Sequence, residues 1–137
     1  MLDLFAAAFE DPESYSSAPP STAYQAELLS DPKFVALVAV SGEQVIGALA
    51  AYELRKFEQE RSELYMYDLA VAEKWRRRGV ATALIQWLRD HATAVGAWTI
   101  YVQADPPDEP AVALYDKLGI REEVLHFDIA PLARGTD

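Results

Sequence analysis

The sequence predicts one α/β domain whose mixed β-sheet carries helices on both faces. Two strand-like segments, residues 34–40 and 45–54, flank the turn Ser41-Gly42-Glu43-Gln44 and predict an antiparallel hairpin. A strand–helix–strand order over residues 63–102 predicts a parallel pair, because such crossovers join parallel strands. A length of 137 residues suits a single domain over residues 1–137, and 51% hydrophobic residues suffice for a core.

Hydrophobic spacing and turn residues predict the elements in order. They are helices over 2–9 and 22–29, strands over 34–40, 45–54 and 63–71, a helix over 78–95, a strand over 98–102, a helix over 110–118 and a strand over 120–129. The long helix is the clearest, because one of its faces is formed by Val80, Leu84, Ile85, Leu88 and Ala92. Gly96 and Gly119 are predicted to end the two later helices, and serines and prolines over 14–21 predict a loop.

Composition excludes several classes of protein and of site. Cysteine is absent, which excludes disulfide scaffolds, thiolate zinc sites and cysteine nucleophiles. Only two histidines occur, His91 and His126, and their separation gives no metal-ligand spacing, so no metal is expected. No apolar run reaches the roughly 18 residues of a membrane span, and the N-terminus lacks the pattern of a signal peptide. We therefore expect a cytoplasmic protein that does not enter a membrane.

The charge favours a cationic partner. Twelve Lys and Arg against 22 Asp and Glu give a net charge of −10, which repels nucleic acid and anionic membranes. An acidic surface kept only for solubility explains the composition equally well. The distribution is more telling, because four of the basic residues lie together at Lys74, Arg76, Arg77 and Arg78. The sequence thus predicts two ligands of opposite charge.

The basic cluster stands where a strand gives way to a helix. The segment YDLAVAEKWRRRGVATA ends a strand at Val71 and opens the long helix near Gly79. Free backbone N–H groups at a helix start attract phosphates, a glycine admits their close approach, and arginines add charge-assisted bonds. A merely solvated helix start is the alternative. The spacing favours a cradle for a pyrophosphate, although neither a P-loop nor a dinucleotide fingerprint is present.

These residues carry a family resemblance. A strand followed by R-x-x-G-x-A at a helix start is similar to motif A of the GNAT N-acetyltransferases, and DEPAVALYDKLGI resembles their downstream tyrosine helix. The blocks VIGALAAY, KFEQERSELYMYDLAV, YVQAD, PAVALY and KLGIREEVLHFDI further resemble the aminoglycoside 3-N-acetyltransferases of the gentamicin-modifying type. That likeness runs from about residue 2 to 129. It implies the GNAT fold and acetyl-coenzyme A as co-substrate.

The resemblance carries the family's coenzyme-binding positions onto this chain. The implied coenzyme A residues are Leu69, Ala70, Val71, Arg76, Arg77, Arg78, Gly79, Val80, Ala81, Thr82, Asp108, Ala111, Leu114, Tyr115 and Lys117. Backbone N–H groups among the first three face the acetyl carbonyl in the family, and the same stretch pairs with the pantetheine arm.

The sequence departs from the family at two places. The family begins with a strand before the first helix, whereas Met1 falls at the helix itself, so that strand is expected to be missing. The position often held by Asn is Asp108, whose ionised carboxylate accepts hydrogen bonds but donates none. Any contact to coenzyme A at that position must then differ or be lost.

Two residues are expected to carry the chemistry. Tyr115 matches the family tyrosine whose hydroxyl approaches the coenzyme sulfur, so the resemblance implies a general acid or thiolate stabiliser; a packing role is the alternative. Asp68 is a charge inside an otherwise apolar strand, which indicates a cleft or an ion pair. We expect it to act on the acceptor amine as base or anchor. Strand alternation places it opposite Tyr67 and Leu69 unless a bulge intervenes.

Further carboxylates are expected to form the wall of a cation site. The candidates for binding substrate are Asp68, Asp105, Glu122, Glu123 and Asp128, with the loop residues Glu58, Glu60 and Glu63 closing the other side. Because Glu122 and Glu123 are adjacent, one of the two is expected to face solvent. His126 is interpreted as a satisfied structural histidine, with a proton relay as the alternative. The aromatic residues Tyr65, Tyr67, Trp75, Trp87 and Trp98 are interpreted as packing.

The favoured function is acetyl transfer from acetyl-coenzyme A to the 3-amino group of gentamicin-like aminoglycosides, which confers antibiotic resistance. One alternative is an enzyme for another cationic amine, either a polyamine or a protein amino terminus. The other is a non-catalytic module that binds acetyl-coenzyme A. Related enzymes are often homodimers, and the exposed strand over residues 34–40 would permit one here.

Overall fold

The computed structural model describes residues 1–9 and 18–132, which fall into two compact units, Met1–Gln103 and Ala104–Asp137. The predicted loop over 14–21 lies partly outside the described residues. Among the described helices, none has the length and apolar character needed to cross a membrane.

The first unit is built on a four-stranded mixed sheet. Its elements, in chain order, are α1 (Leu2–Ala8), α3 (Thr22–Ser30), β1 (Phe34–Ser41), β2 (Gln44–Arg55), β3 (Ser62–Val71), the 3₁₀ turn η1 (Glu73–Trp75), α4 (Val80–Val95) and β4 (Ala97–Tyr101). The strand order is β1-β2-β3-β4, with the first two pairings antiparallel and the last parallel. The α/β fold class, the hairpin and the strand–helix–strand crossover are thereby confirmed.

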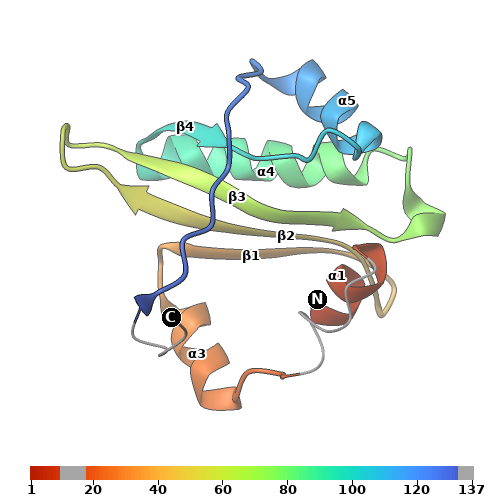
Figure 1. The fold of residues 1–137 in the computed structure, drawn as a ribbon. Coiled ribbons are helices and arrows are strands. Elements are labelled where there is room, and N and C mark those ends of the chain that lie inside the picture. The colour runs from red at the N-terminus through yellow and green to blue at the C-terminus, as the bar shows by residue number, and fades with distance from the viewer. Residues whose placement is uncertain (10–17, 133–137) are drawn as a thin grey trace. The chain divides into compact units, whose positions relative to one another are not determined.

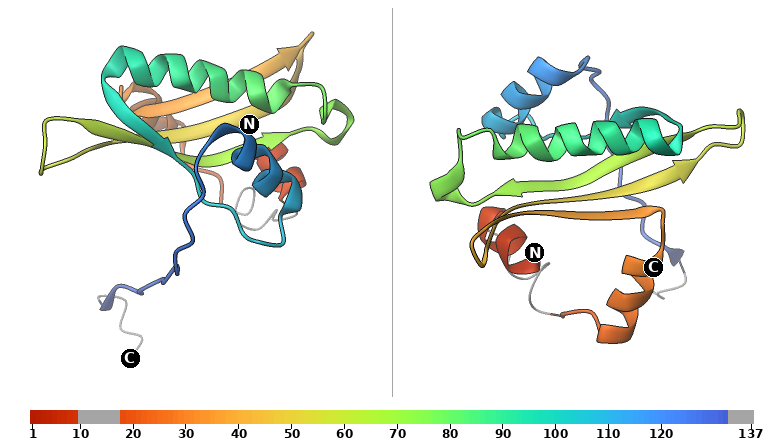
Figure 2. Two further views of the ribbon diagram at one scale, coloured as in Figure 1. Left: turned by 90° about the horizontal axis from the view of Figure 1, so that it is seen from above. Right: turned by 180° about the vertical axis from the view of Figure 1, so that it is seen from behind.

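Helices cover both faces of this sheet. Figure 1 shows α1 and α3 on one face and α4 on the other, and the view from behind in Figure 2 shows the same arrangement. On the first face, Phe5 of α1 packs against Ala48 and Ala70. We call this the α1 face. On the α4 face, helix residues Leu84, Ile85, Leu88 and Ala92 are buried, which confirms four of the five residues predicted for the apolar stripe.

Gly47 sets how closely α4 approaches β2. A Cβ atom at this position would lie 2.8 Å from Cγ1 of Val80 and 3.2 Å from Cδ1 of Leu84. The absence of a side chain therefore lets the first turn of α4 rest directly on the strand. The helix ends as predicted at Gly96, which adopts the left-handed conformation with φ of 77°.

The second unit contains α5 (Glu109–Leu118) and the segment after it. The Asp108 side chain accepts a hydrogen bond of 3.4 Å from the Ala111 amide and so caps the helix, and Gly119 follows its end. The predicted strand over residues 120–129 is wrong: that segment pairs with no strand in the described chain, and its apolar side chains are exposed. Strand propensity shows only that a segment can adopt an extended, hydrogen-bonded conformation. A strand also needs the edge of a neighbouring strand with which its backbone groups can pair.

Candidate active site

The end of β3 is open on one side. The parallel pairing of β3 with β4 stops at Tyr65 and Tyr101, whereas pairing with β2 continues to Val71. Within the described residues, no strand pairs with positions 66–71 on the side that faces away from β2. This stretch includes Leu69, Ala70 and Val71. Its outward backbone N–H and C=O groups can accept an extended ligand as an added strand.

The basic cluster connects this strand to α4. After β3 the chain makes the turn η1, and Nε of Arg76 donates a hydrogen bond of 3.2 Å to the carbonyl oxygen of Val71. The next residue, Arg77, has a φ of 61°, and Gly79 has a φ of 81°. Two left-handed residues within three positions reverse the chain sharply, so that α4 begins at Val80 rather than at residue 78.

The start of α4 has the properties of an anion site. No side chain caps it, and its first amides precede the first intrahelical bond, which Ala83 N–H donates to the Gly79 carbonyl. A Cβ atom built at Gly79 meets nothing within 4 Å, so the space before the helix is open. The Arg78 guanidinium lies over the Trp75 ring at 5.1 Å and remains exposed. These residues fit a pyrophosphate, which needs N–H donors and positive charge at close approach.

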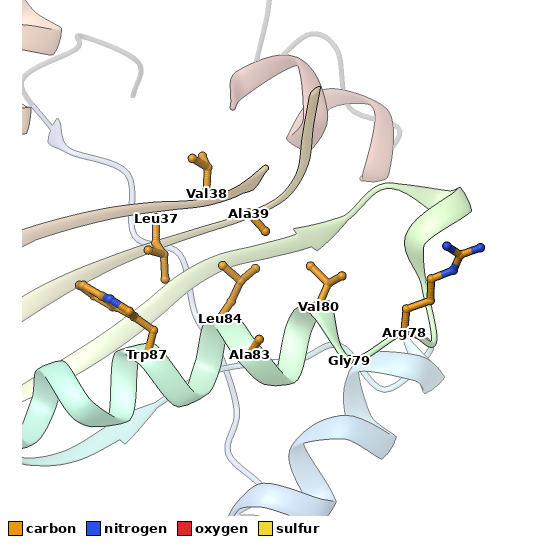
Figure 3. A pocket seen from close by; sticks show the side chains of 9 residues that line it. All are labelled: Leu37, Val38, Ala39, Arg78, Gly79, Val80, Ala83, Leu84 and Trp87. Carbon is orange, nitrogen blue, oxygen red and sulfur yellow. The ribbon is translucent and has the colours of Figure 1, made fainter. Parts of the chain in front are cut away.

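A cavity of about 380 Å³ runs from this helix start along α4. Its lining residues are Leu37, Val38, Ala39, Arg78, Gly79, Val80, Ala83, Leu84 and Trp87. In Figure 3, Leu37, Val80 and Leu84 point into one space between β1 and α4, while Arg78 points away from it. Beyond Arg78 and Gly79 the lining is aliphatic and aromatic. The charged part of a ligand therefore belongs at the helix start and not in the cavity's interior.

Asp68 lies on the α1 face. It pairs in register with Ala50, while Met66 pairs with Ala51, so Tyr67 is the extra residue of a β-bulge. The bulge changes the simple alternation that predicted opposite sides for Asp68 and Tyr67. The Tyr67 ring lies 6.1 Å from that of Tyr52 and 5.3 Å from that of Tyr65, so it shares this face with them. Leu69 remains on the opposite face, as predicted.

In the second unit, Tyr115 and Asp108 lie on α5. Burial and, to a smaller extent, the charge of the Asp108 carboxylate together raise the pKa of the Tyr115 hydroxyl to about 12. The hydroxyl therefore keeps its proton throughout the physiological range, as a proton donor must. Three predicted coenzyme residues on this helix differ in exposure: Ala111 and Leu114 are half-buried, whereas Lys117 is exposed.

Within the second unit, two acids of the predicted wall, Asp105 and Asp128, act on His126. His126 Nε2 lies 2.9 Å from Asp128 Oδ1, and the pKa of His126 is raised by this hydrogen bond, by the charge of Asp128 and by Asp105. His126 is thus exposed and hydrogen-bonded to Asp128, which is compatible with its interpretation as a satisfied structural histidine. Glu122 and Glu123 are both exposed, which corrects the expectation that only one of them faces solvent.

The loop carboxylates are engaged by their own neighbours. Glu58 forms ion pairs with Lys56 at 4.0 Å and with Arg61 at 3.9 Å, and Glu63 pairs with Lys56 at 3.8 Å. These two acids are therefore partly neutralised within the β2–β3 loop region. Their expected role in closing a cation site is correspondingly weakened.

Sequence reasoning missed one feature of the site, a cluster of aromatic rings on the α1 face. Tyr67, interpreted as packing, belongs to this cluster and is 61% exposed. Trp87 and Trp98, also interpreted as packing, lie outside the cluster and are 45% and 55% exposed. The tyrosines at 52, 65 and 101 occupy strands, but only the strand register shows that they adjoin. The signal in the sequence was the occurrence of tyrosines at positions 52, 65, 67 and 101 within three predicted strands.

The open strand, the uncapped helix start and the arginines are the features expected in a class of proteins that bind a phosphate-bearing cofactor. The chain belongs to the acetyltransferase (GNAT) family, whose model matches residues 1–120. Its structure is similar to that of an aminoglycoside acetyltransferase from an uncultured soil sample, with 57% identity, a TM-score of 0.93 and coverage of 95% of this chain and 87% of that one.

Two further comparisons give the range of relatives. A second aminoglycoside acetyltransferase from uncultured soil, crystallised with sisomicin, is 30% identical with a TM-score of 0.86, over 95% of this chain and 85% of that one. Among curated relatives, the ribosomal protein bS18-alanine N-acetyltransferase of Salmonella typhimurium is 29% identical over 53% of this chain and 49% of its own. N-acetyltransferase 8B of Rattus norvegicus is 30% identical over 66% and 40%. The matched segments thus span half or less of these curated relatives.

Proposed function

We propose that this chain is a cytoplasmic enzyme that transfers the acetyl group of acetyl-coenzyme A to an amine of an aminoglycoside. The proposed target is the 3-amino group of the 2-deoxystreptamine ring in gentamicin-like compounds. The observation that carries the proposal is the 57% identity, over 95% of this chain, to an aminoglycoside acetyltransferase of the same fold. A net charge of −10 adds support, because such a substrate bears several ammonium groups.

The proposed coenzyme site combines the helix start and the open strand. The pyrophosphate would bind the first-turn amides of α4 together with Arg76, Arg77 and Arg78. Gly79 would leave room for its oxygens, and Val80, Ala81 and Thr82 would supply the amides. The pantetheine arm would pair with residues 69–71, where β3 has an open side. On α5, Asp108 already caps its own helix, so we assign it no hydrogen bond to the coenzyme.

In the proposed reaction, the nitrogen of the acceptor attacks the thioester carbon while the carbon–sulfur bond breaks. A backbone N–H of the Leu69–Val71 stretch stabilises the negative charge that develops on the carbonyl oxygen. Asp68 accepts the proton that the ammonium must lose, directly or through water. Tyr115 donates its proton to the departing thiolate, and its high pKa keeps that proton available at neutral pH.

A second candidate substrate is a protein amino terminus. It is supported by the similarity to the bS18-alanine N-acetyltransferases, at 29% identity over 73 residues. The chemistry at the thioester would be identical, and only the surface that receives the acceptor would differ.

One assay separates these functions. Release of coenzyme A thiol from acetyl-coenzyme A would be followed with sisomicin, gentamicin, spermidine and a peptide with an N-terminal alanine. We expect turnover with the two aminoglycosides, and NMR of the product should place the acetyl group on the 3-amino nitrogen. Turnover with the peptide alone would transfer the assignment to protein N-termini. Coenzyme binding without turnover on any acceptor would indicate a non-catalytic module.

A further inference from the structure

A row of aromatic rings crosses the whole sheet on the α1 face. In register, Phe34 of β1 faces Tyr52 of β2, Tyr52 faces Tyr65 of β3, and Tyr65 faces Tyr101 of β4. Ring centroids lie 5.2 Å apart for Phe34 and Tyr52 and 4.5 Å for Tyr65 and Tyr101. One ring from each strand thus joins a continuous surface, which we call the tyrosine row.

The β-bulge adds a fifth ring above the row. Tyr67 touches both Tyr52 and Tyr65, and it is the most exposed of the five rings. Tyr52 is also exposed, at 39%. Cross-strand aromatic pairs stabilise sheets by roughly 0.2–1 kcal/mol each. Such pairs form between residues that the strand register places opposite each other, and they do not need a bulge. The bulge turns an additional, mostly exposed ring onto the same face, which the register of the strands alone does not require.

The row borders a negative charge and hydrogen-bonding groups. Burial raises the pKa of Tyr52, and the neighbouring Asp68 carboxylate raises it further, which places that carboxylate close to the row. The Tyr65 hydroxyl donates a hydrogen bond of 2.7 Å to Oε1 of Gln103. The surface therefore combines apolar ring faces with an anionic group and polar groups at its edge.

This combination matches one chemical class among the candidate acceptors. Sugar and aminocyclitol rings have apolar C–H faces that pack flat on aromatic rings, and their ammonium groups are attracted to carboxylates. A linear polyamine has the charges but lacks ring faces. A peptide amino terminus carries one positive charge, and the peptide chain behind it binds through strand pairing or in a groove rather than on a row of aromatic rings.

We propose that the tyrosine row is the acceptor platform, on which the rings of a polycationic aminoglycoside stack while an ammonium group lies beside Asp68. Tyr67 and Tyr52 are then specificity-determining residues, because they recognise ring faces rather than charge. The inference rests on the proposed function for the identity of the acceptor. It adds a surface and named side chains that select a cyclic acceptor over a linear one.

The test is calorimetric binding of sisomicin and spermidine to the full chain, with steady-state kinetics in parallel. The variants are Tyr67→Ala and Tyr52→Ala. Phe57→Ala serves as control, because its ring lies in the β2–β3 loop and is fully exposed. We expect the sisomicin Kd and KM to rise about tenfold in Tyr67→Ala, with spermidine binding and coenzyme A affinity changing less than twofold. Because the Tyr67 side chain is exposed, the melting temperature of Tyr67→Ala should match that of the control Phe57→Ala.

The outcomes separate this inference from the proposed function. If the wild type acetylates sisomicin and neither tyrosine variant changes its KM, the platform is overturned and the function stands. If the wild type binds sisomicin through Tyr67 without acetylating it, the platform stands and the function is overturned. An equal loss of spermidine binding in Tyr67→Ala would overturn the role of ring stacking. If the wild type neither binds nor acetylates sisomicin, both proposals are overturned.

Discussion

Nε of Arg76 donates a hydrogen bond to the carbonyl oxygen of Val71, and this bond joins the last residue of β3 to the first arginine of the basic cluster. The backbone N–H of Arg76 also donates a hydrogen bond of 3.3 Å to the carbonyl oxygen of Glu73 in η1. The strand proposed to hold the acyl arm and the helix start proposed to hold the phosphates are therefore connected by one side chain. A displacement of the strand or of the helix start would therefore be transmitted to the other.

The cradle is tested by Gly79→Asp, with Gly42→Asp as its matched control. Both glycines have positive φ, of 81° and 61°, and neither added Cβ would meet an atom within 4 Å. Each substitution should therefore destabilise the fold by a similar amount, about 1–2 kcal/mol. Only Gly79→Asp puts negative charge before α4. Calorimetry should show its coenzyme A affinity reduced by about tenfold or more, since a charge-assisted bond contributes roughly 1.5–3 kcal/mol. Equal affinities in the two variants would refute the cradle.

Removing the Tyr115 hydroxyl should affect turnover. In Tyr115→Phe we expect kcat to fall by about 10²-fold, the low end for a general acid, because a thiolate needs little assistance. Coenzyme A affinity should stay nearly constant. Because the pKa of Tyr115 is about 12, the wild-type pH–rate profile should show no loss from its ionisation below pH 10. Wild-type turnover in the variant would leave this side chain with a packing role.

Asp68→Asn distinguishes three roles for that carboxylate: base and anchor together, anchor alone, and structural ion pair. For an anchor alone, mainly the KM would rise. We expect kcat to fall and the aminoglycoside KM to rise, because the amide removes both charge and base. The wild-type KM should also rise with ionic strength, since the Debye length is about 8 Å at 0.15 M salt. A lowered melting temperature with unchanged kinetics would instead indicate a structural ion pair. A salt-independent KM together with full activity in the variant argues against any cation site at Asp68.

His126 should titrate above its ordinary range. Its hydrogen bond to Asp128 raises its pKa, so NMR should give a midpoint above 6.5, and Asp128→Asn should lower that midpoint. Because the folded pKa is the higher one, the favourable interaction is complete below the unfolded pKa and is lost as the pH rises through the folded value. Asp105→Asn should lower the midpoint less. A midpoint indifferent to both substitutions would contradict the ion pair.

Sequence patterns predicted the elements well where they carried local signals. The face of α4, its end at Gly96 and the hairpin turn at Gly42 all depend on neighbouring residues, and all are confirmed. The prediction of a strand over 120–129 was wrong because a strand must pair with the edge of another strand, and local propensity gives no information about such a distant partner. The position of Tyr67 depended on a single-residue bulge. No periodicity argument can locate such a bulge, because it breaks the period on which the argument relies.

The candidate site shows the same division. A helix start with its glycine and arginines is a contiguous motif, so the sequence was sufficient to single it out. The tyrosine row is assembled from four strands that span residues 34–101, and only their register makes neighbours of its rings. The ion pairs of Glu58 and Glu63 could likewise not be predicted, because the sequence gives the charges of Lys56 and Arg61 but not which carboxylate each of them contacts.

Because the β3–β4 pairing ends at Tyr65, no described strand pairs with the outward backbone groups of residues 66–71. An extended ligand arm along this stretch would form hydrogen bonds with those groups. Amide hydrogen exchange there should therefore slow far more than elsewhere when coenzyme A is added. Ligand binding and the free energy of unfolding are then coupled, by about 2.7 kcal/mol at a hundredfold excess over Kd. In a cell, the lifetime of the folded chain would follow the supply of its own co-substrate.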